Sequence, residues 1–175
     1  MNCNQKKIPL VFFHDVSGFM VGSRSEHGGI IKDGAKMVSA VSNSTVPKIS
    51  IVIGNSYGAG NYAMCGKAYD PRFIFSWPSG RIAVMGGTQA AKVLMQIQVA
   101  SMKAKGKEPT EQEQQEILDR ISTKYEEETS PYYAAARLWT DGIIDPKNTR
   151  GIISKCITAA NNAPVEKFNV GVIQT

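Results

Sequence analysis

The chain has 175 residues, of which 42% are hydrophobic and 20% charged, and its formal net charge is +5. This length suits one compact domain that buries roughly 70% of its unfolded surface. It carries no block of Lys and Arg of the nucleic-acid-binding type and no apolar run of the roughly 18 residues that a membrane span needs. The composition therefore argues against nucleic-acid and membrane partners.

Cysteine usage and the N-terminus indicate the compartment. Cys3, Cys65 and Cys156 are far apart, odd in number and form no C-x-x-C pair. This pattern predicts reduced thiols in a cytosol-like compartment and a buried, inert Cys65. The N-terminus lacks the features of a signal peptide, so we do not expect secretion. It reads as the end of a helix running into a strand, so we expect the chain to be part of a longer protein.

Two strand–turn–helix units are predicted first. Residues 8–14 form a nearly continuous apolar run, which is typical of a strand buried on both faces. A glycine-rich turn follows, and residues 28–43 show the spacing of a helix. Residues 48–53 predict a second buried strand, which is followed by a turn and a short helix over 59–68.

Short strands and then helices are predicted for the rest of the chain. The strands cover 73–77 and 81–84, and DGIIDP is a short apolar piece between turns. Thr110 and Glu113 match a capping box. The predicted helices cover 88–105, 110–128, 130–139 and 149–161, and the C-terminal FNVGVIQT is predicted to be extended or loosely attached. This order predicts an α/β fold with helices gathered at the C-terminal end.

The stretch IVIGNSYGAGNYAMCG contains a possible nucleophile elbow. GNSYG matches G-x-S-x-G, the elbow of serine hydrolases, whose histidine follows the serine in the chain. Both histidines, His14 and His27, precede Ser56. A site of His14, Asp15 and Ser56 stays open as an alternative, because chain order differs between unrelated triads. Adjacent residues of a strand point to opposite faces, which argues against it.

The overlapping GAGNYA matches the G-x-G-x-x-A of a dinucleotide loop. In a dinucleotide site, that loop follows its strand directly, and an acidic residue stands at the end of the next strand. Gly58 lies five residues beyond Ile53, and the run FIFSWP ends without an acid. We therefore do not expect a dinucleotide site.

A third interpretation uses only the backbone of two turns. SGFMVG and YGAGN each follow a predicted buried strand. Glycine lets the main chain approach a ligand closely, and free N–H groups at a helix N-terminus attract negative charge. Two such turns on adjacent strands can form an oxyanion hole. The alternative is that these glycines only make tight turns. The backbone interpretation gives Ser56 no chemical role.

Four long segments carry a family resemblance. They are IPLVFFHDVSGFMVG, GGIIKDGAKMVSAV, the tract from VPKISIVIGNSYGAGNYAMCGKAYDP to RIAVMGG, and ARLWTDGIIDPKNTR. Together they resemble the C-terminal domain of the carboxyltransferase (β) subunit of biotin-dependent acyl-CoA carboxylases. YGAGNYAMCGKAY with its following SWP is most similar to the methylcrotonyl-CoA carboxylase branch.

The resemblance implies a fold and a division of labour. The fold is crotonase-like, with stacked ββα units and additional C-terminal helices, and residues 1–175 form one carboxybiotin-side domain. Biotin is carried by a partner α subunit, and a separate N-terminal domain holds the acyl-CoA substrate. A homo-oligomer in a bacterial cytoplasm or a mitochondrial matrix is also implied. We therefore expect a carboxyltransferase half-site that is inactive alone.

The resemblance places the chemistry in the two glycine turns. The expected backbone donors to the oxyanion are the amides of Gly18, Phe19, Gly58 and Ala59. Phe19, Tyr57 and Gly60 are expected to line the biotin slot, and no metal is expected in this domain. Two alternatives are a binding module without chemistry and a stand-alone crotonase-type acyl-CoA enzyme. The latter would be expected to present two active-site carboxylates, which the turns lack.

Overall fold

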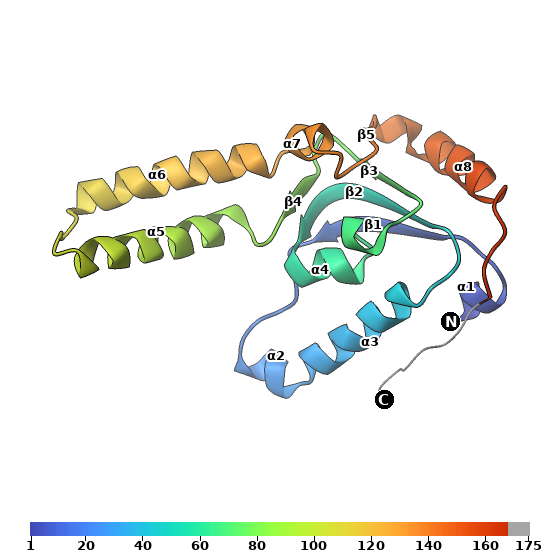
Figure 1. The fold of residues 1–175 in the computed structure, drawn as a ribbon, viewed down its shortest axis with the longest axis horizontal. Coiled ribbons are helices and arrows are strands. Elements are labelled where there is room, and N and C mark those ends of the chain that lie inside the picture. The colour runs from blue at the N-terminus through green and yellow to red at the C-terminus, as the bar shows by residue number, and fades with distance from the viewer. Residues whose placement is uncertain (168–175) are drawn as a thin grey trace.

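Five parallel strands form one sheet in the computed structural model, which describes residues 1–167 (Figure 1). The sheet order is β1-β2-β3-β5, and β4 pairs with the outer end of β2. The strands are Leu10–Val16 (β1), Lys48–Tyr57 (β2), Phe73–Ser76 (β3), Arg81–Ala83 (β4) and Gly142–Ile143 (β5). Strands of a parallel sheet are usually buried on both faces, which explains the apolar runs of the sequence.

Helices fill the connections and the C-terminal half. They are Asn2–Gln5 (α1), Ser23–His27 (α2), Ile30–Ser42 (α3), Gly58–Ala63 (α4), Gly87–Ala104 (α5), Glu111–Glu128 (α6), Pro131–Ala136 (α7) and Thr149–Ala160 (α8), with 3₁₀ turns at Lys67–Tyr69 (η1) and Pro146–Asn148 (η2). The expected α/β order and the helical end before β1 are confirmed. The short, polar α2 was not predicted, and the expected C-terminal extension lies outside the described residues.

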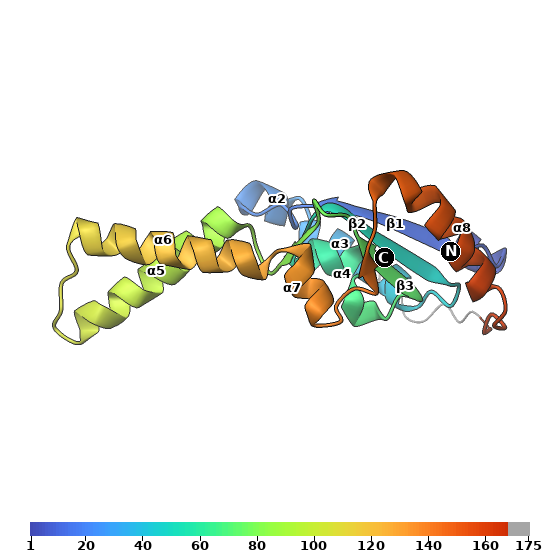
Figure 2. The ribbon, with the colours of Figure 1, turned by 90° about the horizontal axis from the view of Figure 1, so that it is seen from above.

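Alternate residues of β2 face two different helical layers. Ile49 and Ile51 have no exposed surface and pack with Cys156 of α8 in the hydrophobic core. Ser50 lies between them and donates to the Cys65 carbonyl just beyond α4, at 2.7 Å. Figures 1 and 2 show α8 on one face of the sheet and α3 and α4 on the other. The sheet is therefore covered on both faces at β2. The prediction that β1 is buried on both faces is wrong, because β1 is an edge strand in which His14 alone is buried and Phe13 is 45% exposed.

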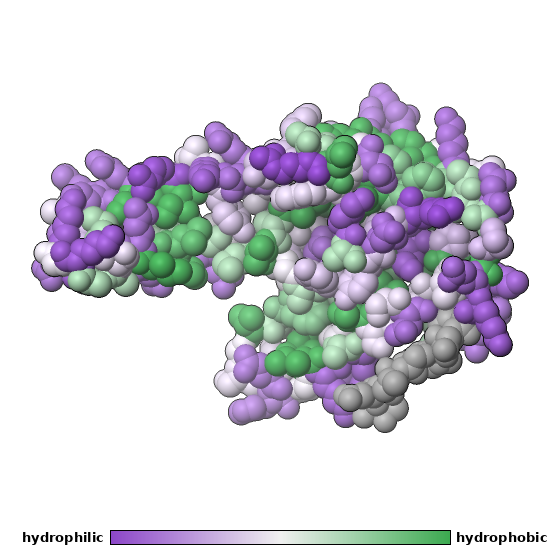
Figure 3. Space-filling model, viewed as in Figure 1, coloured by the Kyte–Doolittle hydropathy of each residue, from purple (hydrophilic) through white to green (hydrophobic). Residues whose placement is uncertain are grey.

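Helices α5 and α6 form an antiparallel arm that projects away from the sheet (Figure 2). The capping box is confirmed, because Glu113 N donates to Thr110 Oγ1 and Thr110 N donates to the Glu113 carboxylate. At the base of the arm, the Tyr125 hydroxyl donates to the Met85 carbonyl at 2.7 Å and accepts from Met85 N at 3.3 Å. Figure 3 shows hydrophobic residues gathered between the two helices of the arm and hydrophilic residues along its upper edge.

Strand β2 is longer than the sequence predicts, because it continues from Ile53 to Tyr57. Its pairing with β1 shifts at this point. His14 lies opposite Val52, but Val16 lies opposite Ser56, so residues 53–55 of β2 face a single residue of β1. The polar end of β2 stays extended because it pairs with β4.

Candidate active site

The two glycine turns meet at the end of the sheet. Gly18 follows β1, and Gly58 opens α4 directly after β2. A Cβ atom placed on Gly60 would lie 3.3 Å from Gly18 Cα and 2.6 Å from Val16 Cγ2. A Cβ atom on Gly18 would lie 3.8 Å from the Tyr57 carbonyl oxygen. Adjacent parallel strands thus bring the two turns into contact, as the backbone interpretation requires.

Gly58 occupies a position that only glycine fits without strain. Its φ of +51° lies in the left-handed region, which side chains with a Cβ atom rarely adopt. A Cβ atom there would also lie 2.8 Å from the carbonyl oxygen of Val84, just beyond β4. The turn after β2 is therefore packed against both β1 and the segment after β4.

The N-terminus of α4 presents backbone donors. Tyr57 is its N-cap residue, and no side chain within residues 1–167 caps it by a hydrogen bond. The first N–H groups of a helix lack intrahelical acceptors, so the amides of Gly58, Ala59 and Gly60 are suited to a negatively charged oxygen. Ala59 is exposed, whereas Gly60 is buried.

An apolar hollow of about 420 Å³ adjoins Gly58. Its lining includes Tyr62, Val84, Tyr133 and Trp139. The rings of Tyr133 and Trp139 meet edge to face, with centroids 5.8 Å apart. This volume falls in the usual range for small-molecule sites. None of these residues was predicted from the sequence, and only tertiary structure brings Tyr133 and Trp139 next to Gly58.

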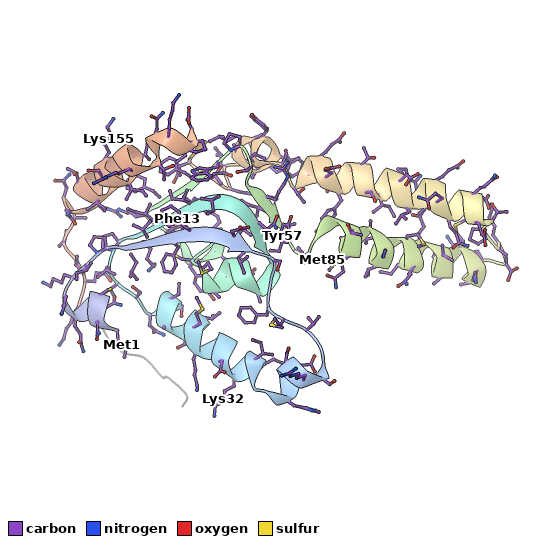
Figure 4. All side chains as sticks on the ribbon, turned by 180° about the vertical axis from the view of Figure 1, so that it is seen from behind. Met1, Phe13, Lys32, Tyr57, Met85 and Lys155 are labelled. Atoms are coloured by element: carbon purple, nitrogen blue, oxygen red, sulfur yellow. The ribbon has the colours of Figure 1, made fainter. Side chains whose placement is uncertain are left out.

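The two predicted slot rings do not share this hollow. The Phe19 ring packs on Gly34 of α3, where an added Cβ atom would collide with it. Tyr57 lines a second, polar hollow of about 450 Å³ at the base of the arm, together with Arg81 and Lys92. Figure 4 shows Tyr57 at the end of β2, near Met85. The biotin-slot role of Phe19 and Tyr57 stays a prediction.

Burial raises the pKa of the Tyr57 hydroxyl, and the positive charge of Arg81 opposes this shift. The hydroxyl is therefore neutral at neutral pH. It can line the polar hollow as a hydrogen-bonding group without carrying charge.

Ser56 is not an exposed nucleophile. It has no exposed surface and lies within β2 rather than on a turn. Its Oγ lies 2.8 Å from His14 Nδ1 and accepts from Asn61 Nδ2 at 2.8 Å. Asp15 lies on the exposed side, where its carboxylate accepts from Asn55 N at 3.1 Å. The strand thus separates Asp15 from the histidine, as its alternation predicts, and the geometry does not favour a serine hydrolase.

His14 is buried in its neutral form. Desolvation lowers the pKa of its imidazole below the ordinary value of 6.5, and the Met64 backbone opposes this shift. Among the described residues, its Nε2 has no hydrogen-bond partner. Because the side chain has no exposed surface, it cannot exchange a proton directly with a ligand.

The prediction that Gly58 lies beyond the end of its strand is wrong. Because β2 extends to Tyr57, Gly58 follows its strand directly. The other argument against a dinucleotide loop holds, because β3 ends at Ser76 without an acidic residue. Helix α4 also has only six residues. The glycine spacing therefore reflects close packing of the turn and not a dinucleotide fingerprint.

Within residues 1–167, no group of three or more His, Cys, Asp and Glu side chains is placed to hold a metal. No helix in this range is both long and apolar enough to cross a membrane. All three cysteines are free, and burial raises the pKa of the Cys65 thiol, which fits the inert role predicted for it.

The carboxyl transferase domain family matches residues 1–170. The chain belongs to this family. It is 54% identical over 172 residues to the mitochondrial methylcrotonoyl-CoA carboxylase β chain of Arabidopsis thaliana, covering 98% of this chain and 29% of that protein. It is 48% identical to the biotin-dependent 3-methylcrotonyl-coenzyme A carboxylase β1 subunit of Mycobacterium tuberculosis, covering 98% and 32%.

Solved structures agree with this carboxyl transferase assignment. The β subunit of geranyl-CoA carboxylase from P. aeruginosa superposes with a TM-score of 0.78 at 41% identity, covering 98% of this chain and 32% of that one. The expected crotonase-like fold and the resemblance to methylcrotonyl-CoA carboxylase β subunits are thereby confirmed. The chain spans about a third or less of the length of these relatives.

Proposed function

We propose that this chain is the carboxybiotin-side half-site of an acyl-CoA carboxylase β subunit of the methylcrotonyl-CoA type. The contact between the two glycine turns carries this proposal, because it gathers backbone donors from two strands at one place. Membership of the carboxyl transferase family and 54% identity to a methylcrotonoyl-CoA carboxylase β chain support it.

When bound, carboxybiotin would supply the carboxyl group that the acyl-CoA gains in exchange for a proton. The amides of Gly18 or Phe19 and of Gly58 or Ala59 would hold the ureido oxygen of the bound ring by donating hydrogen bonds to it. Removing one such donor typically costs about 2.7–4 kcal/mol of transition-state stabilisation. Because these donors belong to the backbone, this site needs no protein nucleophile.

The residues present fit a flat bicyclic ring. The hollow beside Gly58 holds about 420 Å³ and is lined mainly by aromatic and aliphatic side chains. Gly60 is buried and does not line this hollow; its lack of a side chain lets the second turn pack closely against Val16 and Gly18. Phe19 and Tyr57 lie outside this hollow, so their role in the biotin slot stays a separate prediction.

The names of the relatives support proposals for the partners, the missing domain and the location of this chain. The mycobacterial relative is named a biotin-dependent β1 subunit, so we place biotin on a partner α subunit. An N-terminal carboxyltransferase domain would hold the acyl-CoA, and this chain would be its C-terminal counterpart, inactive alone. We further propose a homo-oligomer located in a bacterial cytoplasm or, as for the Arabidopsis relative, in mitochondria, within the matrix.

A two-dimensional ¹H–¹⁵N NMR titration of the 175-residue chain tests the half-site. Free biotin is expected to shift the amides of Gly18, Phe19, Gly58 and Ala59, and an acyl-CoA is expected to shift them little. Gly58→Val should abolish the biotin response, because its side chain meets the Val84 carbonyl. Strong binding of acyl-CoA without a biotin response would instead mean a stand-alone crotonase-type enzyme.

A further inference from the structure

We propose that His14, Ser56 and Asn61 form a buried hydrogen-bonded clasp that holds the two glycine turns in their relative position. The three are then positioning residues, because the clasp acts on the ligand by fixing the backbone donors. This inference rests on the proposed function only where it concerns biotin. The clasp itself is a claim about the ligand-free chain.

The clasp joins the segments that flank both turns. His14 lies in β1, just before the turn at Gly18. Ser56 precedes Gly58 at the end of β2, and Asn61 follows Gly58 inside α4. Ser56 Oγ is the meeting point, with both partner nitrogen atoms at 2.8 Å. One hydroxyl thus connects the strand before the first turn with both sides of the second.

The clasp lies where the backbone ladder is irregular. Residues 53–55 of β2 face only Asp15 of β1, so regular pairing between the two strands is interrupted there. Side chains make connections on both faces of this break. His14 reaches Ser56 on the buried face, and Asp15 accepts from Asn55 N on the exposed face. Side chains therefore add to the pairing of Val16 with Ser56 in fixing the end of β2 against β1.

One tautomer of neutral His14 completes the hydrogen bonds of the clasp. The Asn61 amide donates to Ser56 Oγ, which leaves the serine proton free to point to His14 Nδ1. In the tautomer with its proton on Nε2, neutral His14 accepts this proton at Nδ1. Burial favours this neutral form over the charged one. The arrangement satisfies the Ser56 hydroxyl as donor and acceptor and fixes its rotamer.

The polar character of the clasp points to positioning rather than to stability alone. An apolar pair of similar shape could fill the same buried space without needing hydrogen-bond partners. Directional bonds instead specify one arrangement of strand, turn and helix. Asn61 also lines the apolar hollow beside Gly58, so a displaced clasp would alter both the donors and the slot.

The decisive comparison uses Ser56→Ala and the matched control Ser50→Ala in the full 175-residue chain. Both serines lie in β2 with no exposed surface, but Ser50 bonds the Cys65 carbonyl, away from the turns. Ser56→Ala is expected to shift the ligand-free amide signals of Gly18, Gly58 and Gly60 and to weaken binding of free biotin about tenfold. Ser50→Ala should leave these signals and the biotin affinity unchanged.

A second pair of variants tests the acceptor atom Nδ1 of His14, because one variant removes it and the other replaces it. His14→Phe keeps a ring of similar size without an acceptor, so it should reproduce the amide shifts of Ser56→Ala. His14→Asn places an amide oxygen near the position of Nδ1 and should restore the wild-type spectrum. Urea unfolding of each variant shows whether it is folded. If Ser56→Ala does not fold, the two His14 variants decide the question.

The outcomes separate the clasp from the proposed function. If the wild-type chain does not bind biotin, the half-site is wrong, but the ligand-free spectra still test the clasp. If Ser56→Ala leaves the turn amides as unchanged as Ser50→Ala does, the clasp is overturned. If His14→Phe and His14→Asn give the same spectrum, an acceptor at Nδ1 has no positioning role, which also overturns it.

Discussion

The sheet and the arm are stabilised in different ways. In β2, Ile49, Ile51 and Val52 have no exposed surface, and buried hydrogen bonds tie the strand to its neighbours. In α6, Ile117 is the single buried residue, and Ile97 of α5 is 60% exposed. The candidate site thus lies where burial and directional polar contacts fix the backbone. The arm consists of two helices that mainly stabilise each other.

Truncation of one isoleucine in the sheet and one in the arm should give the largest difference in the free energy of unfolding. Ile51→Ala removes a fully buried side chain and is expected to lower the free energy of unfolding by about 2–5 kcal/mol. Ile97→Ala removes a mostly exposed one and should change it by less than about 0.5 kcal/mol. Urea denaturation measures both. Equal losses would mean that the arm is as strongly coupled to folding as the sheet.

Two glycines with positive φ allow a second contrast. Gly58 has φ +51° and Gly106, between α5 and α6, has φ +76°. Alanine at either position should cost about 1–2 kcal/mol of backbone strain. At Gly58 the methyl group also meets the Val84 carbonyl oxygen, whereas nothing lies within 4 Å at Gly106. Gly58→Ala should therefore lower the free energy of unfolding by about 1–3 kcal/mol more than Gly106→Ala.

Lowering the pH should destabilise the sheet before the arm, and this effect should be smaller than those of the substitutions above. Burial lowers the pKa of His14 below 6.5, so the unfolded chain binds this proton more readily than the folded one. The stability contributed by neutral His14 is present above about pH 6.5 and is lost as the pH falls through its lowered native pKa.

The capping box of the arm should be lost at a lower pH than the stability contributed by His14. The hydrogen bond from Thr110 N lowers the pKa of Glu113 below 4.5, so the capping box persists until the pH falls through that lower value. We expect the urea midpoint to start falling near pH 6.5, while the amide signals of Thr110 and Glu113 stay constant down to below pH 4.5. The fall of the urea midpoint near pH 6.5 should be absent in His14→Asn. A cap lost before the midpoint falls would reverse the order.

The strands and the capping box could be predicted because their signals are local. Apolar runs mark β1, β2 and β3, and Thr110 with Glu113 marks the start of α6. The outer end of β2 was missed because its residues are polar, and only its pairing with β1 and β4 makes it a strand. Helix α2 was missed because five mostly polar residues carry no periodic pattern.

The site was predictable in its backbone but not in its side chains. The glycines at 18 and 58 pointed to two turns on neighbouring strands, and the turns meet. The direction of the Phe19 ring depends on the notch at Gly34, which lies in a different element. The bond between His14 and Ser56 depends on the shift in strand pairing. Neither relation leaves a pattern in the sequence.

The connection between Tyr125 and Met85 has a mechanical consequence. Helix α6 has 18 residues and is therefore about 27 Å long. It acts as a lever whose fulcrum is the double hydrogen bond of the Tyr125 hydroxyl to the Met85 backbone. Val84 is the residue before that fulcrum, and its carbonyl faces Gly58. A sideways force on the tip of the arm thus becomes a torque on the segment that packs against the glycine turn.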